Sequence, residues 1–211
     1  MLRSATTANE DGSARTLRPR VLATAGVAIF VACLALEHLL SPTLDPARHE
    51  ISEYVHTRSG AVMTVGFLAW ALSLAASTVL AWRILRSRAL AALLGIASLS
   101  VVILACFPTQ TSTGALPAGV TLSTTGRLHD VGSGVATTAL LLAATVSTFD
   151  PRLSSAFRRR AAFLIVAAVV SASMLLVVGP AVGGIRQRVV VLAGCLWQVL
   201  LLRALPRNRH Q

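Results

Sequence analysis

Six long apolar stretches, separated by short polar or arginine-rich connections, fill most of this chain after its first twenty residues. An α-helix rises about 1.5 Å per residue, so about 20 apolar residues cross roughly 30 Å of hydrocarbon. Five stretches reach that length. The last apolar run, 189–202, lies between Arg188 and Arg203 and crosses only if the helix tilts or includes Ile185 and Leu205. We therefore predict an all-α protein, a polytopic six-transmembrane-helix bundle over residues 21–205, with helices at about 21–40, 61–82, 89–107, 131–149, 161–180 and 185–205.

The composition agrees with a single membrane domain. Hydrophobic residues make up 55% of the chain and charged residues 13%, whereas soluble domains carry about a quarter charged residues. The polar residues 1–20 predict a disordered cytoplasmic tail, and residues 206–211 a short second tail.

The arginines predict the orientation of the bundle, because short cytoplasmic connections are enriched in them. With the N-terminus inside, fourteen of the nineteen arginines are cytoplasmic. The remaining five lie on the other side and are Arg48, Arg58, Arg127, Arg186 and Arg188. We therefore predict a multi-pass plasma-membrane protein with both termini in the cytoplasm. The formal charge of +11 does not indicate nucleic acid, since the arginines flank apolar stretches. The predicted partner is the lipid bilayer, and the sequence identifies no protein partner.

Polar chemistry gathers at the predicted outer face. Four of the five histidines fall there, namely His38, His49, His56 and His129. So do five of the eight acidic residues, namely Glu37, Asp45, Glu50, Glu53 and Asp130. Glu37 and His38 come one turn before the end of the first apolar stretch, so they either form a polar site beneath the surface or reach the lipid headgroups.

The connection between the first two helices carries a second polar pattern. Asp45 and Pro46 resemble a helix start, and on a helix His49, Glu53 and His56 would share one face. Such a face can bind a divalent metal or shuttle a proton. The spacing does not match H-E-x-x-H, however, so we predict an interfacial helix without a metal.

His129 and Asp130, predicted at the start of the fourth helix, offer a third site. An imidazole oriented by a carboxylate is a usual general base, although neighbouring residues on a helix point about 100° apart. Ser52 is not surrounded by a G-x-S-x-G pattern, which argues against a serine nucleophile.

Three blocks of residues together resemble the signature of DUF998, a family of uncharacterised bacterial membrane proteins. These blocks are Arg48-His49-Glu50-Ile51-Ser52-Glu53-Tyr54, Phe107-Pro108-Thr109 and Gly126-Arg127-Leu128-His129-Asp130. The resemblance implies a six-helix membrane fold and marks Ser52, Glu53, His129 and Asp130 as recurrent polar positions, but it implies no reaction. Where the family commonly has Asp after F-P-T, this chain has Gln110, which removes one carboxylate from the outer mouth.

These observations predict an integral membrane protein with an outward-facing pocket of histidines and carboxylates. The candidate catalytic residues are His129, Glu53 and Asp130, and the candidate pocket residues are Glu37, His38, His49, Ser52 and Gln110. We predict no cofactor. The sequence leaves open whether the protein is a metal-assisted hydrolase acting on a lipid, a transporter of a small solute or of protons, or a non-catalytic accessory protein.

Overall fold

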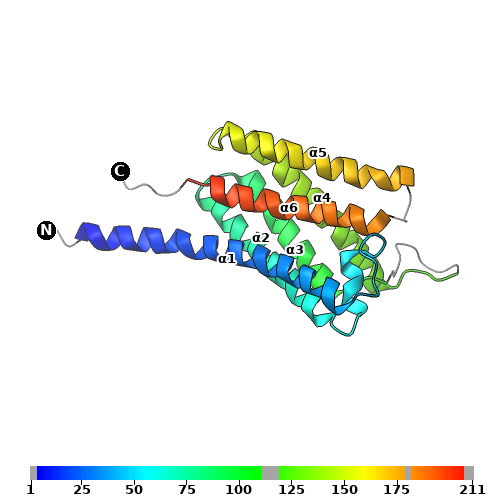
Figure 1. The fold of residues 1–211 in the computed structure, drawn as a ribbon. Coiled ribbons are helices and arrows are strands. Elements are labelled where there is room, and N and C mark those ends of the chain that lie inside the picture. The colour runs from blue at the N-terminus through cyan, green and yellow to red at the C-terminus, as the bar shows by residue number, and fades with distance from the viewer. Residues whose placement is uncertain (1–3, 111–118, 179–181, 207–211) are drawn as a thin grey trace.

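The computed structural model describes residues 4–110, 119–178 and 182–206, and within them the fold is all helical, with no strand (Figure 1). The elements are α1 (Ser4–Leu40), η1 (Ile51–His56, a 3-10 helix), α2 (Ala61–Arg83), α3 (Arg88–Cys106), α4 (Thr124–Thr148), α5 (Ser155–Val178) and α6 (Gly183–Ala204). The all-α class predicted from the sequence is confirmed.

Five helices in the described part of the chain are long and apolar enough to cross a membrane. They are Arg18–Leu40 within α1, and the whole of α2, α3, α4 and α6. The last stretch, which had the shortest apolar run, is among them because α6 begins at Gly183 and so has 22 residues. α5 has 24 residues but is not one of the five, and its amino-terminal turns carry Arg158, Arg159 and Arg160.

Three helices, α1, α4 and α5, begin six or more residues earlier than the apolar pattern predicted. α4 starts at Thr124 because the Ser123 side chain accepts a hydrogen bond from the Gly126 amide at 3.1 Å, which caps the first turn. His129 therefore lies in the second turn of α4. The backbone of α1 is helical from Ser4, whereas the sequence predicted a disordered tail through residue 20. Extending an existing helix adds one hydrogen bond per residue, while starting one is costly.

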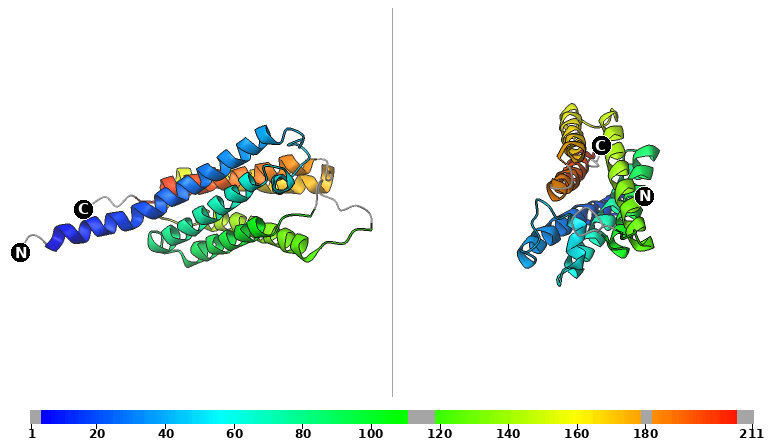
Figure 2. Two further views of the ribbon diagram at one scale, coloured as in Figure 1. Left: turned by 90° about the horizontal axis from the view of Figure 1, so that it is seen from below. Right: turned by 90° about the vertical axis from the view of Figure 1, so that its right-hand side faces the viewer.

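The helices α1 to α4 pack as successive neighbours, and α5 and α6 form a hairpin that lies beside them (Figures 1 and 2). α1 and α2 approach closely at Gly26, where a Cβ atom would lie 2.4 Å from the Ala69 carbonyl oxygen. Phe30 and Trp70 stack beside this crossing with ring centroids 4.7 Å apart. Small residues allow this contact, since surrounding lipid gives helices no hydrophobic reason to associate.

A buried amide fixes α6 against α2. The Gln198 side chain is fully buried; its oxygen accepts from Trp70 Nε1 at 3.2 Å. Its Nε2 donates to the hydroxyls of Ser73 and Ser77, both at 2.9 Å. Every hydrogen-bonding atom of this amide thus has a partner, which sets the register of α6.

The two ends of the described chain lie on the same side of the bundle (Figure 1). Arg20 of α1 donates hydrogen bonds to the carbonyl oxygens of Leu205, at 3.3 Å, and Pro206, at 2.5 Å. The opposite end, here called the η1 end, holds η1, residues 41–60 and the first turns of α6. The predicted polar residues gather there.

Candidate functional site

The segment that precedes η1 does not form the predicted helix. Asp45 and Pro46 lie in a turn, and the helix begins only at Ile51 with Glu50 as its N-cap. The cause is a reciprocal cap in which Glu53 Oε1 accepts from the Glu50 amide at 3.2 Å. The prediction that three side chains share one face is therefore wrong. His49 still contacts Glu53, with Nδ1 and Oε2 2.7 Å apart.

His56, the third member of that pattern, points elsewhere. It is exposed, and its Nε2 lies 2.5 Å from the Thr109 carbonyl oxygen, to which it donates. This bond ties the end of η1 to the segment that follows α3.

Arg188 is the residue around which the η1 end is organised. Its Nη1 donates to the carbonyl oxygens of His49, at 2.6 Å, and Gly184, at 3.1 Å. Its Nη2 donates to the Tyr54 hydroxyl at 3.1 Å, and the guanidinium lies 5.6 Å from the centre of that ring. Its Nε donates to His38 Nε2 at 3.2 Å. One cation thus joins α1, the loop, η1 and α6.

His38 has a defined hydrogen-bonding state in this arrangement. Its Nδ1 lies 2.6 Å from the Leu34 carbonyl oxygen and must donate to it, so the neutral ring offers Nε2 as the acceptor for Arg188. The neighbouring Glu37 is fully buried; its Oε2 accepts from Ser41 Oγ at 3.1 Å and Ser59 Oγ at 2.8 Å. The second carboxylate oxygen, Oε1, is buried and has no hydrogen-bond partner among the described residues.

Glu50, at the end of the loop between α1 and η1, forms an ion pair with Arg186 of α6. Its carboxylate accepts from Arg186 Nη2 at 2.9 Å and from Gln187 Nε2 at 3.2 Å. The Gln187 oxygen accepts in turn from the Ile51 amide at 2.5 Å. Burial raises the pKa of Glu50 above its usual 4.5, and the Arg186 charge opposes that rise.

The adjacent residues His129 and Asp130 diverge. His129 is buried, and its Nδ1 donates to the Phe107 carbonyl oxygen at 2.7 Å. Asp130 is exposed and has no hydrogen bond or ion pair within the described residues. The imidazole is therefore oriented by a backbone carbonyl and not by the carboxylate, as expected for side chains about 100° apart on a helix.

Gln110 connects the segment after α3 to the segment that leads into α4. Its Nε2 donates to the Thr121 carbonyl oxygen at 3.2 Å, and its oxygen accepts from the Ser123 amide at 2.6 Å. The amide joins the end of the α3 connection to the start of α4. The family's usual aspartate would keep the acceptor and lose the donor.

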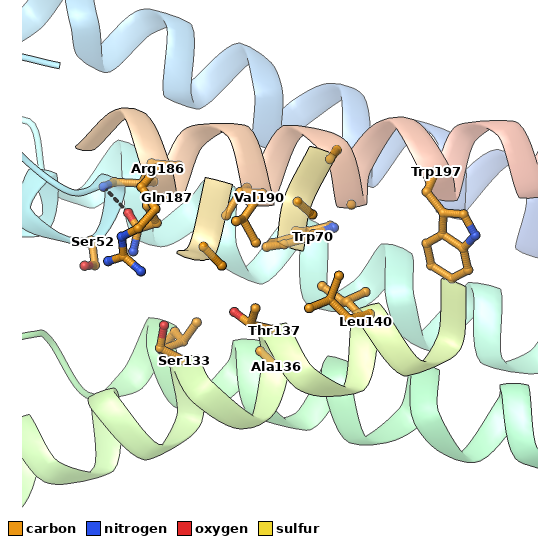
Figure 3. Close-up of a pocket in the computed structure, with 18 of the residues that line it drawn as sticks. Ser52, Trp70, Ser133, Ala136, Thr137, Leu140, Arg186, Gln187, Val190 and Trp197 are labelled. Atoms are coloured by element: carbon orange, nitrogen blue, oxygen red, sulfur yellow. Dashed lines mark hydrogen bonds between the residues drawn. The ribbon is translucent and has the colours of Figure 1, made fainter. Parts of the chain in front are cut away.

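A cavity opens between α4, α5 and α6 (Figure 3). It contains about 1050 Å³ of empty space, part of it open to the surroundings. Polar side chains stand at the η1 end of the cavity, and these are Glu50, Ser52, His129, Ser133, Arg186 and Gln187. Apolar side chains line the remainder, among them Trp70, Ala136, Leu140, Ala144, Ala168, Val190 and Trp197. Of the predicted site residues, only Ser52 and His129 line this cavity.

The cavity is elongated, and Trp197 lies at the end away from η1 (Figure 3). It follows α4 from Ser133 to Ala144 and α6 from Arg186 to Trp197, which corresponds to roughly 16 Å along each helix. The Trp197 indole lies at the far end and is held by a hydrogen bond of 3.1 Å to Ser147 Oγ.

The sequence analysis missed three consecutive residues, Arg186, Gln187 and Arg188. The signal was present, because these two arginines are exceptions to the cytoplasmic bias of the others. A charge in the first turns of an apolar helix, on the side that carries few arginines, needs an internal partner. Within the described residues, no three His, Cys, Asp or Glu side chains converge as a metal site requires.

Comparison with known proteins agrees with the motifs. A family model described as "Protein of unknown function (DUF998)" matches residues 24–204, which cover most of the first candidate span, Arg18–Leu40, and all of the other four found in the described residues. No curated protein and no solved structure matches the chain. The likeness of the three sequence blocks is thus confirmed over most of the length, and the chain belongs to the DUF998 family of membrane proteins of unknown function.

Proposed function

We propose that this chain is a plasma-membrane protein with six spans and both termini in the cytoplasm. Five candidate spans in the described residues support a multi-pass protein, and α5 would supply the sixth. The shared position of the two described ends supports an even number of spans. The arginine bias then puts the η1 end outside.

Cysteine labelling tests this orientation. The chain is made free of Cys33, Cys106 and Cys195, and single cysteines replace Arg48 at the η1 end or Arg152 at the other end, where both side chains are well exposed. An impermeant maleimide added to intact cells labels position 48, and labels position 152 only after permeabilisation. The reverse pattern contradicts the proposal.

The function that the geometry supports best is the binding of an amphiphile from the outer leaflet. The observation that carries it is the cavity, which is apolar along most of its length, polar at one end and lined by Trp197 at the other. A single hydrocarbon chain fits the apolar part, while its headgroup stays at the η1 end. Ligand sites are commonly apolar clefts with a few placed polar groups.

A matched pair of substitutions tests the binding. Gly194 lines the cavity, and a Cβ atom there would meet only Leu140 at 3.8 Å, so Gly194→Leu places a side chain in the empty space without a backbone clash. Gly134 on α4 is exposed with nothing within 4 Å, so Gly134→Leu is the control. A long-chain alcohol with a photoactivatable diazirine crosslinks to wild type and control, and at least tenfold less to Gly194→Leu. Equal crosslinking of all three refutes this site.

Two alternatives receive less support. A metal-assisted lipid hydrolase needs clustered ligands, and the described residues offer no such cluster. Transport needs a path through the protein, whereas the residues that line this cavity extend no farther along α6 than Trp197, which is buried. A binding protein without catalysis therefore agrees best with the structure.

A further inference from the structure

The charges at the mouth of the cavity cancel. Arg186 and Glu50 form an ion pair of 2.9 Å, and their side chains are 24% and 20% exposed. Arg188 donates its hydrogen bonds to acceptors within the protein, namely His38 Nε2, the His49 carbonyl oxygen and the Tyr54 hydroxyl. His129 gives its Nδ1 hydrogen to a carbonyl, which leaves Nε2 of the neutral ring as an acceptor. Of the charged side chains that line the cavity, Glu50 and Arg186 are paired with each other, and among the described residues Arg186 Nε is a buried donor that lacks a partner.

Several hydroxyls at the cavity lack partners. Within the described residues, Ser52, Ser133 and Thr137 make no hydrogen bond, although each lines the cavity. Deeper in α4 the behaviour differs, since the Thr145 hydroxyl donates to the Leu141 carbonyl at 2.8 Å. A hydroxyl facing an apolar space without a partner costs free energy, so these groups indicate a ligand that supplies hydrogen bonds.

Two of these hydroxyls, those of Ser133 and Thr137, form a polar stripe on α4 together with His129. His129, Ser133 and Thr137 are four residues apart on α4, so they lie on one face over roughly 12 Å. Figure 3 shows Ser133 and Thr137 on the side of α4 that faces the cavity, opposite Arg186. The polar part of the ligand must therefore be extended and carry more than one oxygen.

The headgroup, and not the alkyl chain, determines which amphiphile the cavity prefers. Membrane hydrocarbon solvates an alkyl chain about as well as a cavity lined by Leu and Val does. Hydrogen bonds at the mouth, by contrast, form only with a headgroup whose donors and acceptors match the stripe.

We infer that the ligand is a single-chain amphiphile whose headgroup is uncharged and bears several hydroxyl or ester oxygens, as in a monoacylglycerol. This inference rests on the proposed amphiphile site. Its hydroxyls donate to His129 Nε2 and exchange hydrogen bonds with Ser133 and Thr137, and its chain extends toward Trp197.

A headgroup series with one chain length tests the inference. A monoacylglycerol, a fatty acid and an alkyltrimethylammonium compete, at pH 8, with the photoactivatable alcohol for the purified protein in detergent. The monoacylglycerol competes at least tenfold better than either ion. If an ion competes equally well or better, the inference is overturned while the amphiphile site stands. If none competes and the alcohol does not crosslink, both proposals fail.

Two neighbouring threonines supply the matched variants. Thr137→Val removes a cavity hydroxyl and keeps the shape, and Thr138→Val makes the same change at an exposed position. Loss of one hydrogen bond weakens monoacylglycerol binding about two- to tenfold for Thr137→Val, and leaves Thr138→Val unchanged. Equal affinities of the two variants contradict the proposed contact.

A gain of binding tests the charge balance. Glu50→Gln keeps an acceptor for Arg186 but removes the compensating charge. The ratio of fatty-acid to monoacylglycerol affinity then rises at least tenfold over that of wild type. An unaltered order of headgroups overturns the argument from charge, and the folded state of the variant is checked by its thermal unfolding.

Discussion

The Arg188 contacts make the sharpest prediction about the stability of the η1 end. Arg188→Met keeps most of the side chain's length and removes four hydrogen bonds, to His38, His49, Gly184 and Tyr54. At about 0.5–1.5 kcal/mol net each, four bonds amount to about 2–6 kcal/mol. Arg188 is only half-buried, so water restores part of that bonding, and we expect a loss of about 2–3 kcal/mol.

Thermal unfolding in detergent, followed by tryptophan fluorescence, measures this loss. For a chain of this length, a loss of that size lowers Tm by about 4–12 °C. Arg127→Met is the control, since Arg127 is exposed at the same end and has no hydrogen bond or ion pair within the described residues. A Tm for Arg188→Met within about 1 °C of the control would refute the view that this cation holds α6 to the loop.

Further predictions concern the helix contacts and the mouth. Gly26→Val forces α1 and α2 apart, because its Cβ would lie 2.4 Å from a backbone oxygen; it costs about 3 kcal/mol or more and lowers the yield of monodisperse protein, unlike Gly134→Val. Gln198→Leu removes three interhelical hydrogen bonds and lowers stability by about 1–2 kcal/mol, which thermal unfolding measures. Because burial raises the pKa of Glu50, its contribution to stability is complete below pH 4.5 and declines as pH rises. The Tm of Glu50→Gln relative to wild type therefore increases from pH 4 to pH 7, and a constant difference contradicts this.

The sequence predicted the helices well because hydrocarbon imposes a length and a composition on each span, and both are local properties. It predicted the start of α4 less well. The apolar pattern begins at Val131, whereas the helix begins where Ser123 caps it. Ser123 is a residue type that commonly caps helices. The first turns of α4 are polar, however, so a prediction based on apolar residues starts the helix too late.

The site was predicted only in outline. The sequence motifs and the predicted topology placed the polar residues at one end of the bundle. The spacing of His49 and Glu53 predicted the contact between them. The pairs that organise the η1 end could not be predicted from spacing, because Glu50 and Arg186 are 136 residues apart in the sequence. No local pattern specifies such a pair. The cavity, in turn, depends on how the α5 and α6 hairpin packs against α4.

Native mass spectrometry of the protein, purified from its own membrane in a mild detergent, tests the central claim most directly. We predict one bound single-chain lipid of neutral charge on wild type and on Gly134→Leu, and none on Gly194→Leu, whose side chain fills the cavity. The same lipid adducts on all three proteins would contradict the claim that the space between α4, α5 and α6 holds an amphiphile.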